Sequence, residues 1–325
     1  MFEKLKKDLN YKLVNWQMKK GHSVLFGKPF SLVLDTSSLC NLECVWCPTG
    51  QKRNSRTQCI MPYDKVIDIF DKLGPYLKKV MLCNWGEPLL NKDLIKEITY
   101  IKTKYDFHLI LSSNLNTQLS QEDAENLINS GIDVLICSID GATQNTYEKY
   151  RRKGCLNTAL ENLKLLIKSK QKYKKKSPYI VWQYLVFKHN EHEISKAKEM
   201  ANDIGVDNIH FVKPWCPEDW ISTLPEYSNY IINEKEKKEY KNITKHCYCL
   251  WTTIVINANG SVSPCCSVED EKNDFGNFFN QSLFKLWNNK NYRVARKYNI
   301  TRKKNNINNI CVACDHIGTC PDPCK

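Results

Sequence analysis

The chain has 325 residues, of which 42% are hydrophobic and 26% are charged, and its formal net charge is +13 at pH 7. Its length allows one large α/β domain with a small appendage, and its hydrophobic content excludes a globally disordered chain. No segment approaches the ~18 apolar residues of a membrane-spanning helix, and residues 1–20 lack the apolar run of a secretory signal. We therefore expect a cytoplasmic protein with no membrane span.

Much of the positive charge lies in short runs, such as residues 168–176 and 302–304. Such runs are typical of solvated helix ends and loops, although they also suit the docking of an acidic electron donor or an anionic substrate. Nucleic-acid-binding proteins combine this kind of charge with recognisable motifs. No such motif accompanies the charge here, so we expect no nucleic-acid partner.

Strands and helices are predicted to alternate along the first two thirds of the chain. Apolar runs predict strands at residues 31–36, 79–84, 107–113, 133–139, 179–187 and 207–213. Amphipathic segments predict helices at residues 62–73, 91–104, 120–130, 143–150, 157–173 and 191–204. Six such units predict a parallel sheet, either a partial barrel or an open doubly wound sheet. In both folds, ligands bind at the carboxyl ends of the strands.

After the sixth strand the alternation stops. Residues rich in Pro, Trp and charge come first, and a predicted hairpin with an Asn259-Gly260 turn and a helix near 282–298 follow. We therefore expect four regions, namely an N-terminal helical extension (1–29), an α/β core (30–213), a linker or lid (214–246) and a small cysteine-rich domain (247–325).

The sixteen cysteines are clustered, with three between residues 40 and 47 and eight between 247 and 324. Because disulfides are disfavoured in the cytoplasm, this clustering indicates metal binding. Cys40, Cys44 and Cys47 follow the first strand with the spacing C-x3-C-x2-C. Three thiolates can bind three irons of a cubane cluster and leave the fourth iron open, which is typical of a reactive site. A zinc site is the alternative, and Cys59 is the nearest residue for its fourth ligand.

This loop resembles the signature of the radical S-adenosylmethionine (SAM) superfamily, C-x3-C-x-aromatic-C, with Trp46 as the aromatic residue. The resemblance extends over almost the whole chain. It implies an α/β fold, a partial (β/α)6 TIM-like barrel with a small cysteine-rich C-terminal domain. It also implies a [4Fe-4S] cluster that binds SAM and cleaves it to a 5′-deoxyadenosyl radical. The reductant would be a protein such as flavodoxin or ferredoxin.

The ends of the later strands resemble the SAM-binding positions of that superfamily. Residues 84–88 (NWGEP) resemble the Gly-Gly-Glu-Pro motif, with Trp85 in place of the first glycine. The resemblance assigns Glu87 to the SAM amino group and either Arg151 or Arg152 to its carboxylate. It assigns Leu185 to adenine, although core packing explains this leucine equally well. The residues assigned to the ribose are Ser113, Asn114, Ser138 and Asp140.

The C-terminal cysteines resemble the SPASM domain of sulfatase-maturing and peptide-modifying radical SAM enzymes. Cys249, Gly260 and Cys265 fit C-x10-G-x4-C, and a final C-x2-C-x5-C-x3-C run comprises Cys311, Cys314, Cys320 and Cys324. The last cysteine of the family pattern is absent. The shorter twitch variant, with one cluster, would use Cys247, Cys265, Cys311 and Cys314. We expect one or two auxiliary [4Fe-4S] clusters; a zinc ribbon is the alternative, although it usually has two CxxC pairs and only one is present.

The substrate is the least determined property. The resemblance to compact SPASM or twitch enzymes implies oxidation or epimerisation of a carbohydrate-like alcohol, with peptide modification as the alternative. A non-catalytic iron–sulfur or zinc scaffold, or an electron carrier, is the alternative of another class. The substrate would be a small molecule, a glycan or a peptide. Past the sixth strand, Trp215 and Trp220 could stack on sugar faces, and the Cys216 thiol could return a hydrogen atom in an epimerisation.

Overall fold

The computed structural model describes residues 2–228, 247–303 and 309–314. Its strands are β1 (Ser31–Leu34), β2 (Lys79–Leu82), β3 (His108–Ser113), β4 (Val134–Ser138), β5 (Tyr179–Leu185), β6 (Asn208–Val212), β7 (Thr253–Ile256) and β8 (Val262–Ser263). Its longer helices are α1 (Phe2–Lys19), α2 (Tyr63–Leu73), α3 (Leu94–Lys104), α4 (Gln121–Asn129), α6 (Leu156–Lys172), α7 (Ile194–Ile204) and α12 (Lys290–Thr301). Its shorter helices are α5 (Gln144–Tyr150), α8 (Pro225–Ser228), α10 (Cys249–Thr252) and α11 (Leu283–Trp287).

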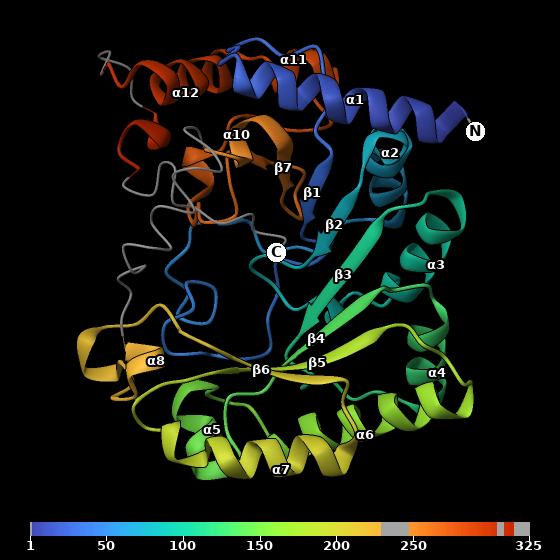
Figure 1. Ribbon diagram of the computed structural model, residues 1–325, viewed down its shortest axis with the longest axis vertical. Coiled ribbons are helices and arrows are strands. Elements are labelled where there is room, and N and C mark those ends of the chain that lie inside the picture. The colour runs from blue at the N-terminus through green and yellow to red at the C-terminus, as the bar shows by residue number, and fades with distance from the viewer. Residues whose placement is uncertain (1, 229–246, 304–308, 315–325) are drawn as a thin grey trace.

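All eight strands belong to one curved, unclosed sheet in the order β6-β5-β4-β3-β2-β1-β7-β8. Strands β1 to β7 run parallel, and only β8 is antiparallel to its neighbour β7. Helices α2 to α7 cover one face of the sheet, as Figure 1 shows. The predicted βα alternation and the partial barrel are confirmed.

Side chains alternate between the two faces of each strand. On β2, Val80 and Leu82 are buried against the helices, whereas Lys79 and Met81 point to the inside of the partial barrel and line a cavity there. Successive strands repeat this pattern, so the main hydrophobic core lies between the sheet and the outer helices. The strand ends are therefore held rigidly, which fixes the loops that follow them.

The C-terminal region contributes to the same sheet. Strand β7 pairs in parallel with β1, and it forms the predicted hairpin with β8 through a turn in which Gly260 has a φ of 80°. Helices α1, α11 and α12 lie together beyond this edge (Figure 1). The prediction of a single helix over 282–298 is wrong. The chain forms α11 and α12 instead, because the Asn289 side chain accepts a hydrogen bond from Tyr292 N and starts a new helix.

In the described part of the chain, no helix combines the length and the apolar character needed to cross a membrane.

Candidate functional site

The cysteine loop follows β1 and is bound to the end of α5. Glu43 N donates to Arg152 O (3.0 Å), and Val45 N donates to Tyr150 O (3.1 Å). The backbone at Gly50 packs closely on the backbone at Cys44. A Cβ at position 50 would lie only 2.6 Å from Cys44 N, so a residue with a side chain does not fit there. Backbone contacts therefore determine the shape of the segment that carries the three cysteines, before any metal binds.

The protein surroundings of Cys40 and Cys44 disfavour their thiolate forms unless a positive charge compensates for burial. Cys44 is buried, and Cys40 and Cys47 are half-buried. Burial raises the pKa of Cys40 to about 12, and burial also raises the pKa of Cys44 against the charge of Arg151. Arg151 Nη1 lies 3.8 Å from Cys44 Sγ. A metal cluster would supply the missing positive charge and stabilise the thiolates.

Glu87 lies in the loop after β2 and faces the end of β3. Its carboxylate is buried and accepts hydrogen bonds from Ser113 Oγ (2.8 Å), Asn114 N (2.8 Å) and Leu89 N (3.0 Å). Burial raises the pKa of Glu87, and these three donors oppose the shift. The Asn114 amide also reaches 3.8 Å from Cys40 Sγ. The structure thus brings Glu87, Ser113 and Asn114 together beside the cysteine loop.

Asp35, at the end of β1, organises the motif before Glu87, and the sequence analysis missed it. It accepts hydrogen bonds from Asn84 N (2.5 Å) and from Trp85 N (3.0 Å to Oδ2). Burial raises the pKa of Asp35 to about 6, opposed by these backbone donors. Gly86 is required next to them, because a Cβ there would lie 1.8 Å from Ser37 O. The sequence signal that could have identified Asp35 is its position, because it is a carboxylate that directly follows a buried strand.

Cys83 corrects one expectation. The predicted strand 79–84 includes this residue, and a cysteine inside an apolar strand is expected to pack in the core, as Cys137 does on β4. It lies instead one residue past β2, with a φ of 151°, a conformation that costs energy for a residue with a side chain. Its thiol contacts Gly86 O at 3.5 Å. Cys83 is therefore part of the wall around the site.

The ends of β4 and β5 are joined by buried polar groups. Asp140 accepts from Arg151 Nε (2.6 Å) and from Leu185 N (2.7 Å), so both carboxylate oxygens are bound within the chain. Asn190, fully buried, donates to Asp140 O (3.0 Å) and to Leu185 O (2.9 Å). These contacts hold Arg151 against Cys44. Ser138 is buried on β4, in register with Gln183.

Arg151 and Arg152 point in different directions. The Arg151 side chain is directed to Asp140 and Cys44, as described above. Arg152 lines a separate pocket outside the cysteine loop. Leu185 packs against the hydrophobic cluster that includes Leu42 and Cys44, which places it beside the loop.

The residues fit an iron–sulfur cluster with a bound ligand. The Trp46 Nε1 atom is buried next to Cys47 and has no hydrogen-bond acceptor in the described part of the chain. No three His, Cys, Asp or Glu side chains in residues 2–228, 247–303 and 309–314 lie close enough to chelate one ion. A cubane cluster binds each cysteine through a different iron, so its ligands lie further apart than those of a single zinc ion.

A second group of cysteines gathers beside α10 and α12. Burial raises the pKa of Cys311, and the nearby Cys247, Cys265 and Cys314 raise it further. A hydrogen bond from Cys249 lowers the pKa of Cys247. The structure therefore brings together the four cysteines of the single-cluster alternative, with Cys249 next to them. Cys320 and Cys324 lie outside the described residues.

Comparison with known proteins agrees with this geometry. Residues 35–201 match the radical SAM superfamily, and residues 247–315 match SPASM, an iron–sulfur cluster-binding domain. The chain is 25% identical to the AdoMet-dependent heme synthase of Methanosarcina barkeri, over 90% of both chains. It is 24% identical to the GTP 3′,8-cyclase of Lactiplantibacillus plantarum, over 75% of this chain and 69% of that one.

Two solved structures share the fold. SuiB of Streptococcus suis bound to S-adenosylmethionine has a TM-score of 0.62 at 16% identity, covering 95% of this chain and 75% of that chain. The anSMEcpe structure with bound AdoMet has a TM-score of 0.59 at 17% identity, covering 89% and 87%. The chain therefore belongs to the radical SAM superfamily and has a C-terminal SPASM domain, with SAM, a [4Fe-4S] cluster and auxiliary iron–sulfur clusters as its cofactors.

Proposed function

We propose that this enzyme cleaves SAM reductively to a 5′-deoxyadenosyl radical and uses that radical to abstract a hydrogen atom from a carbohydrate-like alcohol, which is thereby oxidised or epimerised. The proposal of SAM cleavage rests on one observation. The cysteine loop, Glu87 and Arg151 lie close together at neighbouring strand ends. One anionic and one cationic side chain beside an open metal position suit an amino acid such as the methionine part of SAM.

The chain's own residues hold that arrangement rigidly. Glu87 is fixed by donors from β3, and Arg151 is fixed by Asp140. In this proposal Cys40, Cys44 and Cys47 hold the SAM-binding cluster, Glu87 binds the SAM ammonium, and Arg151 binds its carboxylate. The auxiliary cluster would be held by Cys247, Cys265, Cys311 and Cys314. We also keep the proposed division into the regions 1–29, 30–213, 214–246 and 247–325.

The test is SAM cleavage by the anaerobically reconstituted holoprotein. With dithionite as reductant, we expect 5′-deoxyadenosine and methionine in equal amounts. We expect roughly eight irons per chain, or about twelve with two auxiliary clusters, at four irons per cubane. A colourless protein with stoichiometric zinc and no 5′-deoxyadenosine would contradict the proposal and favour a scaffold.

Glu87→Gln should weaken SAM binding. The amide replaces an acceptor oxygen with a donor nitrogen, and Asn114 N, whose N–H cannot rotate away, would lose its acceptor. The neutral amide also loses the charge-assisted hydrogen bond to the SAM ammonium, which contributes about 1.5–3 kcal/mol, so we expect a roughly 10- to 150-fold rise in the Kd for SAM. Glu161→Gln is the matched control, because Glu161 lies exposed on α6 beside Lys164. An unchanged Kd in Glu87→Gln would contradict the assignment.

The segment after β6 supports a sugar-like substrate. Trp215 is 74% exposed, which makes it the most exposed of the large hydrophobic side chains described, and Trp220 packs at 5.5 Å from Trp46 between ring centroids. Aromatic faces of this kind pack well on sugar rings. Cys216, between the two, packs on the cluster formed by Leu42, Cys44 and Phe187. Its thiol is thus on the same side of the barrel as the cysteine loop.

Cys216→Ala should separate epimerisation from oxidation. An epimerase returns a hydrogen atom to the opposite face of the substrate carbon, and a thiol donor becomes a thiyl radical that must be reduced by one electron and one proton. In an oxidation no hydrogen atom is returned. If Cys216 is the donor, the variant should still form 5′-deoxyadenosine but give no epimer. An unchanged product from this variant would reject the donor role and favour oxidation.

We propose flavodoxin or ferredoxin as the reductant and the cytoplasm as the location. The number of cysteines supports the cytoplasm, where thiols stay reduced. The cluster requires a low-potential electron source, which supports flavodoxin or ferredoxin.

A further inference from the structure

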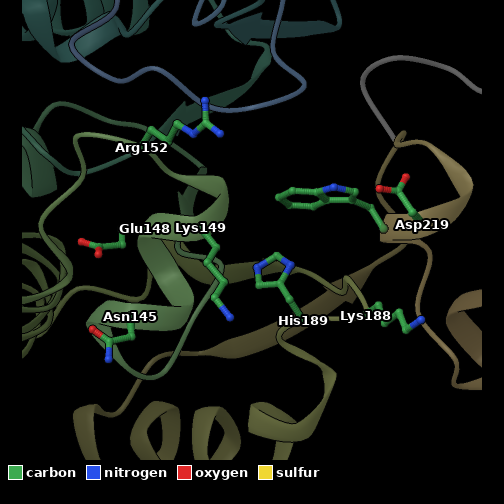
Figure 2. A pocket seen from close by; sticks show the side chains of 8 residues that line it. Asn145, Glu148, Lys149, Arg152, Lys188, His189 and Asp219 are labelled. Carbon is green, nitrogen blue, oxygen red and sulfur yellow. The ribbon is translucent and has the colours of Figure 1, made fainter.

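A pocket of about 820 Å³ opens beside α5, between this helix and the segments that follow β5 and β6. Its cationic lining residues are Lys149, Arg152 and Lys188. In Figure 2 the Lys149 ammonium is directed toward the His189 ring, and Arg152 lies on the same side of α5. Two segments that are distant in sequence, the end of α5 and the segment after β5, thus carry the positive charge that lines one concave surface.

These three cations form no ion pair with any described residue. In the parts of the chain that the structure describes, no carboxylate lies within ion-pair distance of Lys149, Arg152 or Lys188, although many other lysines and arginines are paired. Two carboxylates line the same pocket. Glu148 accepts a hydrogen bond from Gln144 Nε2 (2.8 Å) and points away from His189 in Figure 2, so the lining carries three cations against two carboxylates. Like charges that share a concave surface repel one another, and a bound anion would remove that cost.

The other wall of the pocket is aromatic and neutral. Burial and the charge of Lys149 lower the pKa of His189 to about 4, so this ring is uncharged at pH 7. Its Nε2 atom is buried and has no hydrogen-bond partner in the described part of the chain. The Trp220 ring packs edge-on against His189 at 4.9 Å between centroids. The pocket therefore combines a cationic side with a flat, uncharged aromatic surface.

Both walls are connected to the cysteine loop. Arg152 O accepts from Glu43 N, between Cys40 and Cys44. Trp220 packs on Trp46, which is adjacent to Cys47. A molecule seated in this pocket would thus contact Arg152 and Trp220, which themselves pack on the loop that carries the SAM-binding cysteines.

We propose that this pocket binds an oxyanion group of the substrate, a phosphate or a carboxylate, through Lys149, Arg152 and Lys188. The substrate class is then an anionic carbohydrate-like alcohol rather than a neutral one, and this refinement rests on the proposed function. The anionic group is held at the pocket and the ring packs beside Trp220, which directs the remainder of the molecule toward the cysteine loop.

The test measures anion binding directly on the anaerobic holoprotein by calorimetry at low ionic strength. Inorganic pyrophosphate and citrate are the two probes, and the tighter one tells whether the group is a phosphate or a carboxylate. We expect the triple variant Lys149→Ala/Arg152→Ala/Lys188→Ala to bind the preferred probe at least tenfold more weakly. We also expect binding to weaken as salt is added, because these cations are exposed.

The control removes the same charge elsewhere, in Lys174→Ala/Lys175→Ala/Lys176→Ala, on the exposed loop after α6. It should change the Kd by less than twofold. Lys149→Arg/Lys188→Arg keeps the charge and should retain binding, which excludes misfolding as the cause of the loss. Equal weakening in the control, or no binding of either probe to the wild type, would overturn the proposal. Binding without SAM cleavage would overturn only the proposed function.

Discussion

Cys44→Ala should abolish 5′-deoxyadenosine formation while the protein keeps its auxiliary iron. Cys44 is the most buried of the three loop cysteines, and its thiol lies beside Arg151 Nη1. Removing one of three ligands from a cluster that already has an open iron leaves two, which should prevent stable assembly. We expect the iron content to fall from roughly eight to about four per chain. Iron analysis and chromatography of the reaction products measure both effects.

Cys155→Ala is the matched control for this variant. Cys155 is exposed, at the start of α6, and belongs to neither cysteine group. Its replacement should leave both the iron content and SAM cleavage unchanged. Full turnover by Cys44→Ala would contradict the assignment of the loop. Loss of all iron in Cys44→Ala would show that the two cysteine groups do not bind iron independently.

The sequence predicted those features that depend on short stretches of chain. Apolar runs located the six strands of the barrel, and a spacing of eight residues located the three cysteines. Polar residues that follow neighbouring parallel strands lie at one edge of the sheet, so Glu87, Ser113 and Asn114, which the resemblance assigned to SAM, were all expected at that edge. Each of these signals lies within one strand and the loop that follows it.

The features that were missed depend on contacts between distant segments. The pairing of β7 with β1 joins residues about 220 positions apart, and no local period shows it. Arg151 and Arg152 are equivalent in sequence, and only the position of Asp140 determines which one faces Cys44. The break between α11 and α12 depends on a single asparagine cap, which a helical pattern of hydrophobic residues does not reveal.

Arg56 is the most consequential of these missed residues. It follows the cysteine loop, and its guanidinium is bound to Asp274 across the interface with the C-terminal region (2.9 Å from Nη1 to Oδ2). Nη2 also donates to Val268 O (2.5 Å) and Ser263 Oγ (3.1 Å). The Arg56 and Asp274 side chains are 3% and 5% exposed. Since Ser263 is two residues from Cys265, this pair connects the segment after the SAM-binding cysteines to the auxiliary cysteines.

Arg56→Met should therefore be strongly destabilising. The variant leaves the Asp274 carboxylate buried without its counter-charge, which costs about 3–5 kcal/mol when one partner of a buried pair is removed. We expect the apparent melting temperature of the anaerobic holoprotein to fall by roughly 6–10 °C, measured by circular dichroism. We also expect iron to be lost from the auxiliary site first, because the hairpin that carries Cys265 loses its attachment.

Two further variants test whether the loss of stability in Arg56→Met arises because the pair is buried and because one charge is left without a partner. Lys72→Met breaks an exposed pair with Asp68, whose side chains are 47% and 40% exposed, and exposed pairs contribute about 0–1 kcal/mol. Its melting temperature should change by no more than about 2 °C. Arg56→Met/Asp274→Leu removes both charges and should recover much of the loss, since no charge then stays buried alone. If Arg56→Met were no more destabilising than Lys72→Met, the Arg56–Asp274 pair would not hold the two cysteine-bearing regions together.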